Sequence, residues 1–129
     1  MKILAIPAVL LAMALPLAAQ SPAEQVAAYA AAAGAAADPA AGQAMFTATQ
    51  SGGKPDTPSC TTCHGTDLTK AGQTRAGKAI DPMAPSVQAD RYTDPAKVEK
   101  WFVRNCNSVL GRECSAKEKA DILAWLASL

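Results

Sequence analysis

Apolar residues recur at the spacing of an α-helix in three stretches of the chain. The first stretch begins at Asp38-Pro39 and ends near Gln50. It carries on one side Gly42, Met45, Phe46 and Thr49. A glycine four residues before an aromatic ring leaves room for another helix to approach closely. We therefore predict a helix that crosses and contacts a second one.

The other two periodic stretches lie near the C-terminus. Thr93-Asp94-Pro95 opens a helix with an amphipathic stripe of Val98, Trp101, Phe102 and Asn105. Ser115 and Glu118 form a capping box for the last helix. The buried stripe of that helix is Ile122, Trp125, Leu126 and Leu129. Asn105 stands out because a buried amide must find a hydrogen bond or a metal.

A further helix is predicted from its ends. Ser21 and Glu24 form a capping box with Pro22 at the first helical position, and Gly34 follows the expected end at Ala33. The segment is rich in alanine, so it is a good helix former but a poor core former. We expect a peripheral helical arm, an extension over residues 20–37 ahead of a domain over residues 38–129.

The first 19 residues are typical of a secretory signal peptide. Lys2 gives a positive start, residues 3–17 are mainly apolar, and the small residues Ala18 and Ala19 follow. The apolar run is short for a membrane-spanning helix, which needs about 20 residues; an uncleaved anchor is the alternative. We expect export to the periplasm, with cleavage near Ala19 or Ser21.

The charges of the chain are balanced. Its 129 residues include 12 basic and 11 acidic ones, and removal of the leader takes away Lys2. The exported chain, one domain of about 110 residues, is then near neutral. This balance gives no support to a nucleic-acid or membrane-surface partner.

The strongest chemical motif is Cys60-Thr61-Thr62-Cys63-His64, the C-x-x-C-H signature of covalent c-type haem. Both sulfur atoms would form thioether bonds to the haem, and His64 would give an imidazole nitrogen to the iron. A redox C-x-x-C pair does not need the histidine. A closed zinc site needs four ligands, and His64 is the only histidine in the sequence. We predict one covalent haem c per chain.

Residues 65–92 show little periodicity and no stretch that reads as a confident strand. Gly and Pro interrupt a loop of a length that is usually functional or disordered, and a haem edge would suffice to order it. Arg75, Lys78 and Arg91 are candidates to pair with the haem propionates; solvated surface charges are the alternative for each.

The order helix, haem motif, loop, helix, helix is that of a class I cytochrome c. We therefore predict an all-α fold packed around one covalent haem, in which the N- and C-terminal helices of the domain cross. Gly42 and Phe46 would meet Trp125 at that crossing. The haem, a large apolar plate, would supply much of what the helices pack against.

Two cysteines remain outside the motif. Export to an oxidising compartment favours a disulfide between Cys106 and Cys114, with two free thiols as the alternative. The bridge would join the end of the third helix of the domain to the start of the last one, and it would restrain the backbone after Asn105.

The sequence pattern alone does not identify the sixth ligand of the iron. Met83 lies in a proline-flanked loop but only 19 residues after His64, whereas Asn105 lies 41 residues after it and nearer the place where class I cytochromes supply their ligand. Met45 belongs to the predicted helix crossing, and Asn107 falls on the opposite side of its helix from Asn105. An open or water-bound iron is the third possibility.

The sequence also resembles the sphaeroides haem protein (SHP) family of small, oxygen-binding, high-spin cytochromes c. The resemblance rests on residues 54–65, 71–75 and 98–101, and above all on the run Arg104-Asn105-Cys106-Asn107-Ser108-Val109. It implies that Asn105 ligates the oxidised iron beside a Cys106–Cys114 bridge. It also implies that the reduced iron binds O₂, and a ferrous site opened by loss of the amide could bind NO as well. The implied electron donors are a dihaem cytochrome c and a membrane b-type cytochrome.

Three functions follow from these alternatives. The first is a redox cytochrome with a labile Asn105 ligand that binds a diatomic gas when reduced. The second is a plain electron carrier with Met83 as sixth ligand. The third is a small reductase of oxygen or nitrogen oxides, which the sequence supports least because it offers no clear distal acid or base apart from Asn105. We expect a redox protein without catalytic residues.

Overall fold

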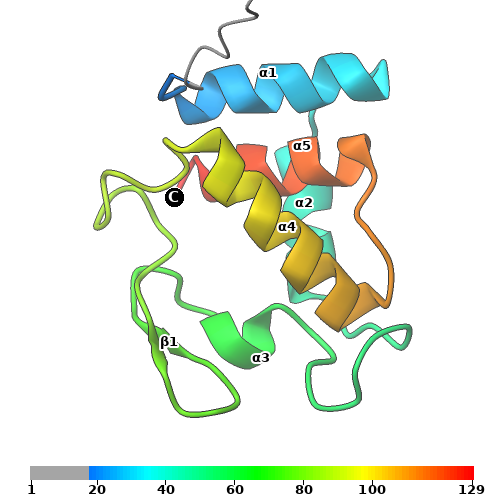
Figure 1. Cartoon of the computed structure of the whole chain (residues 1–129), viewed down its shortest axis with the longest axis vertical. Helices are drawn as coiled ribbons and strands as arrows, with labels where there is room; N and C mark the ends of the chain where they lie inside the picture. Colours follow the sequence, from blue (N-terminus) through cyan, green and yellow to red (C-terminus); the bar gives the residue numbers. More distant parts are fainter. Residues whose placement is uncertain (1–17) are drawn as a thin grey trace, which may run out of the picture.

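The computed structural model describes residues 18–129, so nearly all of the predicted leader lies outside the described residues. The described chain forms five helices: α1 (Pro22–Ala33), α2 (Pro39–Thr47), α3 (Thr61–His64), α4 (Pro95–Leu110) and α5 (Ala116–Leu126). It also forms two short strands, β1 (Gly72–Gln73) and β2 (Ala79–Ile80). Figure 1 shows α5 between α1 and α2, with α4 in front and α3 and β1 at the opposite end from α1. No helix of this part of the chain has the length and apolar character that crossing a bilayer requires.

The predicted crossing is between α2 and α5. A Cβ atom at Gly42 would lie 2.1 Å from the backbone oxygen of Asp121, so the two helices touch at this glycine. One turn later the rings of Phe46 and Trp125 meet with centroids 5.2 Å apart. Phe46 thus contacts Trp125 as predicted, whereas Gly42 faces Asp121 and Ile122.

Helix α2 ends at Thr47, three residues before the expected end. Ala48 takes an extended conformation, and the N–H of Gln50 donates to the carbonyl of Pro58 at 2.6 Å. This contact draws the chain toward the haem motif. Thr49 is therefore outside the helix and exposed, and the prediction that it extends the stripe was wrong.

The close approach at Gly42 gives a testable prediction. Gly42→Ala should lower the free energy of unfolding by about 3 kcal/mol, the upper end for overpacking, because the new methyl group meets backbone atoms. Gly34→Ala is the matched control, since Gly34 has φ of 64° but nothing within 4 Å of an added Cβ. It should cost only about 1 kcal/mol for the left-handed backbone. Equal losses in chemical denaturation would contradict the tight crossing.

Helix α1 lies on the outside of the molecule but is firmly attached. Gln25 is only 3% exposed, and its side-chain amide donates to the carbonyls of Gln20 and Tyr92. The hydroxyl of Tyr29 donates to Glu99 of α4 at 2.7 Å. Because α1 and α2 both pack on α5, more of α5 is buried than its apolar stripe predicts, including Ala120 and Leu123.

Helix α4 presents a different face to the core from the predicted one. Its buried residues are Val98, Cys106 and Val109. Trp101 is 44% exposed and Asn105 is also exposed, so these two members of the predicted stripe stand beside the buried face. The stripe was misplaced because the pattern did not count Cys106 as an apolar core residue.

The strands β1 and β2 form a hairpin that the sequence did not predict. They pair antiparallel, with Gly72 opposite Ile80 and Gln73 opposite Ala79. Two residues per strand are too few for an alternating pattern to be visible. A Cβ atom at Gly72 would lie 2.3 Å from the carbonyl oxygen of Cys63, so the hairpin packs directly on α3.

Candidate haem site

The C-x-x-C-H motif forms a single helical turn. Cys60 is the N-cap of α3 and His64 its last residue, and the N–H of His64 donates to the carbonyl of Cys60 at 3.1 Å. The hydroxyl of Ser59 accepts from the N–H of Thr61 at 3.3 Å and supports the start of the turn. Gly65 then leaves the helix with φ of 72°. The turn holds both cysteines and the histidine on one short, fixed segment.

The imidazole of His64 is held against the core. Its ring centroid lies 5.8 Å from that of Phe46. Burial, and secondarily the charge of Arg91, lowers the pKa of His64, which favours the neutral form that binds metals. Its Nδ1 atom is buried without a hydrogen-bond partner among residues 18–129. A buried polar atom of this kind calls for an explanation, and an imidazole reserved for a metal is a sufficient one.

Cys60 and Cys63 are not part of a disulfide in the structure. Burial raises the pKa of the Cys60 thiol to about 11. Redox C-x-x-C pairs depend on a lowered thiol pKa, so this environment does not suit one. Within residues 18–129 there is also no group of three or more His, Cys, Asp or Glu side chains that could hold a metal ion. The donor set suits a haem bound through two thioethers and one imidazole.

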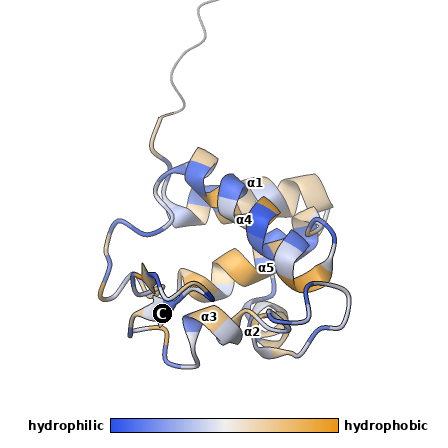
Figure 2. Ribbon diagram, turned by 60° about the horizontal axis from the view of Figure 1, so that its bottom comes forward, coloured by the Kyte–Doolittle hydropathy of each residue, from blue (hydrophilic) through white to orange (hydrophobic). Residues whose placement is uncertain are grey.

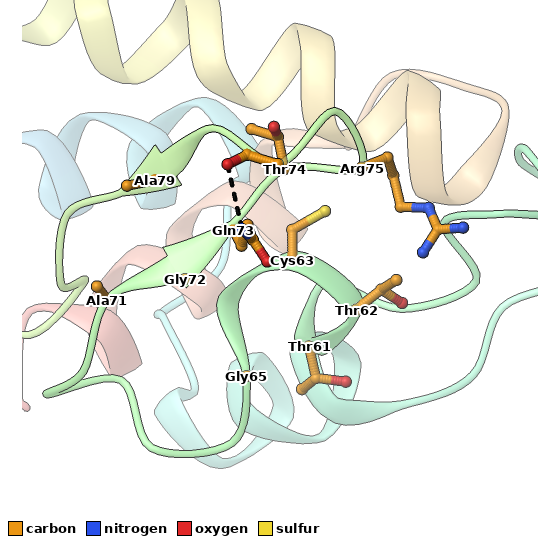
Figure 3. Close-up of a pocket in the computed structure, with 11 residues that line it drawn as sticks. Thr61, Thr62, Cys63, Gly65, Ala71, Gly72, Gln73, Thr74, Arg75 and Ala79 are labelled. Atoms are coloured by element: carbon orange, nitrogen blue, oxygen red, sulfur yellow. Dashed lines mark hydrogen bonds between the residues drawn. The ribbon is translucent and has the colours of Figure 1, made fainter.

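A cavity of about 600 Å³ lies between α3 and the hairpin. Its lining includes Thr62, Cys63, Gln73 and Arg75. Figure 3 shows the sulfur of Cys63 pointing away from the α3 ribbon, with Arg75 beyond it. Cys60 and His64 do not line this cavity: Cys60 packs against a core cluster that includes Phe46, and the ring of His64 lies against the same Phe46.

The two candidate sixth ligands lie in different surroundings. Met83 packs against the cluster of Phe46, Leu68, Ile122 and Leu126, as does Cys60. Its N–H donates to Leu68 at 2.9 Å, and its carbonyl accepts from Tyr92 at 2.8 Å. Asn105 lies on α4 with an exposed side chain. Tyr92, whose φ of 62° is in the left-handed region, is a support of this loop that the sequence pattern did not indicate.

The three predicted propionate partners have different neighbours. Arg91 donates from Nε to the carbonyl of Pro82 at 2.7 Å and also to that of Asp81. Arg75 lies 3.7 Å from Asp56 in an exposed ion pair, which contributes little to stability. Lys78 is exposed on the hairpin. Their pairing with propionates stays a prediction.

The segment before the motif is packed tightly on the end of α4. Added Cβ atoms at Gly52 and Gly53 would lie 2.4 Å from the carbonyl of Leu110 and 2.2 Å from that of Ser108. The N–H of Lys54 donates to the same Ser108 carbonyl at 2.8 Å. The haem-attachment segment and the helix with Asn105 are thus joined directly. The pair Gly52-Gly53 is the sequence signal for this contact, because two adjacent glycines without side chains allow the backbones to approach this closely.

Cys106 and Cys114 are paired in the structure, with Cα atoms 5.6 Å apart. Their loop is short, eight residues in sequence separation. Loss of the bridge in Cys106→Ser/Cys114→Ser should cost about 2–3 kcal/mol by the chain-entropy relation. We expect no titratable thiol at these positions in the unfolded, unreduced protein from its native compartment. Two reactive thiols there would show that the residues are not bridged in the cell.

Comparison with known proteins agrees with this reading of the site. A family model described as a domain of unknown function (DUF1924) matches residues 32–126. The chain is 69% identical over 87 residues to the cytochrome c-type protein SHP of Cereibacter sphaeroides, which is 67% of this chain and 67% of that protein. It is 43% identical over 68 residues to cytochrome c'' of Methylophilus methylotrophus, 52% of this chain and 47% of that protein.

Two solved structures share the fold. Oxidised SHP, described as an oxygen-binding cytochrome c, superposes with a TM-score of 0.85 at 65% identity over 86% of this chain and 99% of that one. Oxidised cytochrome c'' superposes with a TM-score of 0.67 at 32% identity over 83% of this chain and 93% of that one. The residues of α3 fit the haem that these relatives share, and the chain is an all-α haem c protein that belongs to the SHP family of cytochromes c.

Proposed function

We propose that this protein is a redox cytochrome in which Asn105 ligates the oxidised iron and leaves it on reduction, so that the reduced protein binds O₂ or NO. The proposal is supported by the SHP structure described as an oxygen-binding cytochrome c and by the run around Asn105 in the sequence. Cys60, Cys63 and His64 would hold the haem. Once attached, the haem supplies an iron that changes oxidation state and accepts small ligands.

The observation that carries the proposal is a difference between two amides on α4. The side chain of Asn107 donates to the carbonyl of Val103 at 2.7 Å, within its own helix. No hydrogen bond involves the side chain of Asn105 among residues 18–129. Asn105 therefore has a free amide directly before Cys106, at a point where α4 is restrained by the paired cysteines and by the Gly53 contact.

The chemistry of the amide explains why its ligation would depend on oxidation state. An amide oxygen is a hard, neutral and weak ligand, so it suits ferric iron better than the softer ferrous iron. Reduction would release Asn105, and the side chain could then turn toward solvent. A methionine thioether would act in the opposite sense, because it holds ferrous iron and raises the reduction potential.

The plain electron carrier with Met83 as ligand is the second candidate. The packing of Met83 against Phe46 and Leu68, and the hydrogen bonds at its N–H and carbonyl, are those of a core residue. A near-infrared absorption band of a thioether on ferric iron would identify this alternative. The reductase alternative would show steady-state turnover of oxygen or a nitrogen oxide with a supplied reductant.

The proposed compartment is the periplasm, and the proposed electron donors are a dihaem cytochrome c and a membrane b-type cytochrome. The compartment rests on the leader predicted over residues 1–19 and on haem attachment outside the cytoplasm. Sequencing the N-terminus of the protein released by osmotic shock tests this directly. A chain that still begins at Met1 would contradict export with cleavage.

The function itself is tested by gas titration of the holoprotein. Under anaerobic conditions the dithionite-reduced protein should bind carbon monoxide and nitric oxide at one site per chain, with a shift of the haem absorption. The oxidised protein should bind neither carbon monoxide nor oxygen. A reduced form that ignores carbon monoxide, as a stable methionine-ligated iron does, would contradict the proposal.

A further inference from the structure

The outer face of α4 carries cations around an exposed tryptophan. Trp101 is 44% exposed. The guanidinium of Arg104 lies 5.1 Å from its ring centroid and the ammonium of Lys100 lies 6.0 Å from it. Lys97, one turn earlier, is exposed as well. We call this surface the α4 cationic face; it consists of Lys97, Lys100, Trp101 and Arg104, at i, i+3, i+4 and i+7 of the helix. Figure 2 shows deep-blue positions on α4.

The positive charge of this face is balanced only weakly: Lys97 is one of the groups that lower the pKa of Asp90, but it forms no ion pair with that carboxyl. The ion pairs of residues 18–129 use Arg75, Arg112, Lys117 and Lys119, and none uses a residue of the α4 cationic face. The nearby acid Glu99 is turned to the other side, where it accepts from Lys119 at 2.6 Å and from Tyr29. An exposed aromatic ring among unpaired cations is typical of the anchor of an interface with an acidic partner.

The position of the face relates it to the iron site. Trp101 precedes Asn105 by one helical turn, and Arg104 is its direct neighbour in the chain. Since the charges of the whole chain nearly cancel, the face is a local feature and not a general attraction for polyanions. A protein that docks here would come next to the helix that carries the proposed ligand.

We propose that the α4 cationic face docks the acidic surface of an electron-donor protein. The inference rests on the proposed function in so far as the iron must be reduced before a gas can bind. Steering by the cations would raise the rate of encounter at low ionic strength. The tryptophan would supply the apolar contact at the centre of the interface.

Reduction kinetics test this with the ferric holoprotein and flavodoxin hydroquinone, an acidic one-electron donor protein. In each encounter the hydroquinone is oxidised to the semiquinone and the ferric iron is reduced to ferrous. Lys100→Glu should lower the second-order rate constant at low ionic strength about tenfold, the lower end for electrostatic steering. The rate constant of this variant should also decrease less steeply than that of the parent as salt is added.

Lys70→Glu is the matched control, because it makes the same change of charge on the exposed loop between α3 and β1. The rate constant of Lys70→Glu should stay close to that of the parent. Lys100→Arg keeps the positive charge and should also have the rate constant of the parent. Reduction by the neutral lumiflavin semiquinone should be equal in all four proteins, which checks that the haem site is intact.

Equal losses in Lys100→Glu and Lys70→Glu would overturn the docking proposal. The proposal would also be overturned if Lys100→Glu left the reduction kinetics unchanged but abolished binding to vesicles rich in phosphatidylglycerol. The α4 cationic face would then bind a membrane surface and not an electron donor. Either result leaves the gas titration and the spectra unaffected, so failure of the docking surface is distinguishable from failure of the proposed function.

Discussion

Asn105→Ala should change the ferric absorption and electron paramagnetic resonance spectra completely while it leaves the ferrous spectrum almost unaltered. Alanine offers no donor atom, so water or hydroxide would take the place of the amide in the oxidised protein. If Asn105 leaves the iron on reduction, as proposed, the substitution would remove nothing from the ferrous iron. The measurement is a pair of spectra in both oxidation states for parent and variant.

Two other variants give this prediction its control. Asn107→Ala removes an amide that is bonded to Val103 within α4 and should leave both spectra unchanged. Met83→Leu should also leave them nearly unchanged, with a small loss of stability because its side chain packs on the core cluster. If Met83→Leu abolishes a thioether band while Asn105→Ala has no effect, the assignment is wrong and the protein is an ordinary electron carrier.

Removal of the two haem-attaching cysteines should abolish cooperative folding. The described residues have a small core, in which Leu123 is the one large side chain less than 2% exposed, and native domains are stable by only about 5–15 kcal/mol. A covalently held haem would add a large apolar surface to that core. We expect Cys60→Ala/Cys63→Ala to show no haem mass and no sharp thermal transition, whereas the parent should carry the mass of one haem.

The double variant Cys106→Ser/Cys114→Ser separates this effect from the general loss of cysteines. It should keep the mass of one haem and a cooperative transition at a lower temperature. A cooperative unfolding of the haem-free variant near that of the parent would show that the helices pack adequately alone. Two haem masses on the parent would contradict the single C-x-x-C-H motif.

Several parts of the fold were decided by local sequence. The starts of α1, α2, α4 and α5 were predicted because their caps are local signals: Ser21, Asp38, Asp94 and Ser115 each accept a hydrogen bond from a backbone N–H within three residues. The C-x-x-C-H motif is local in the same sense, since one helical turn carries all three groups that would hold the haem. Such features need no knowledge of distant residues.

Other parts depend on contacts between residues far apart in the chain. The end of α2, the hairpin at Gly72, and the burial of Gln25 follow from hydrogen bonds and close approaches across the molecule. Helical periodicity also ranked Trp101 above Cys106 for the core, because it scores apolar size and gives no weight to the predicted bridge to Cys114. The free amide of Asn105 likewise becomes visible only when its neighbours are known.

The helical class, the haem motif and the pair of helices that cross could be predicted from the sequence, since caps, periodicity and short motifs are properties of neighbouring residues. Asn105 became a candidate ligand through its distance from His64 and the family resemblance. Three features follow from contacts between distant segments: the buried face of α4, the attachment of α1 to α4 through Tyr29 and to the loop at Tyr92 through Gln25, and the contact of Gly53 with α4. These features depend on how segments far apart in the chain pack together. At such contacts a backbone oxygen of one segment leaves room for only a small residue on the other.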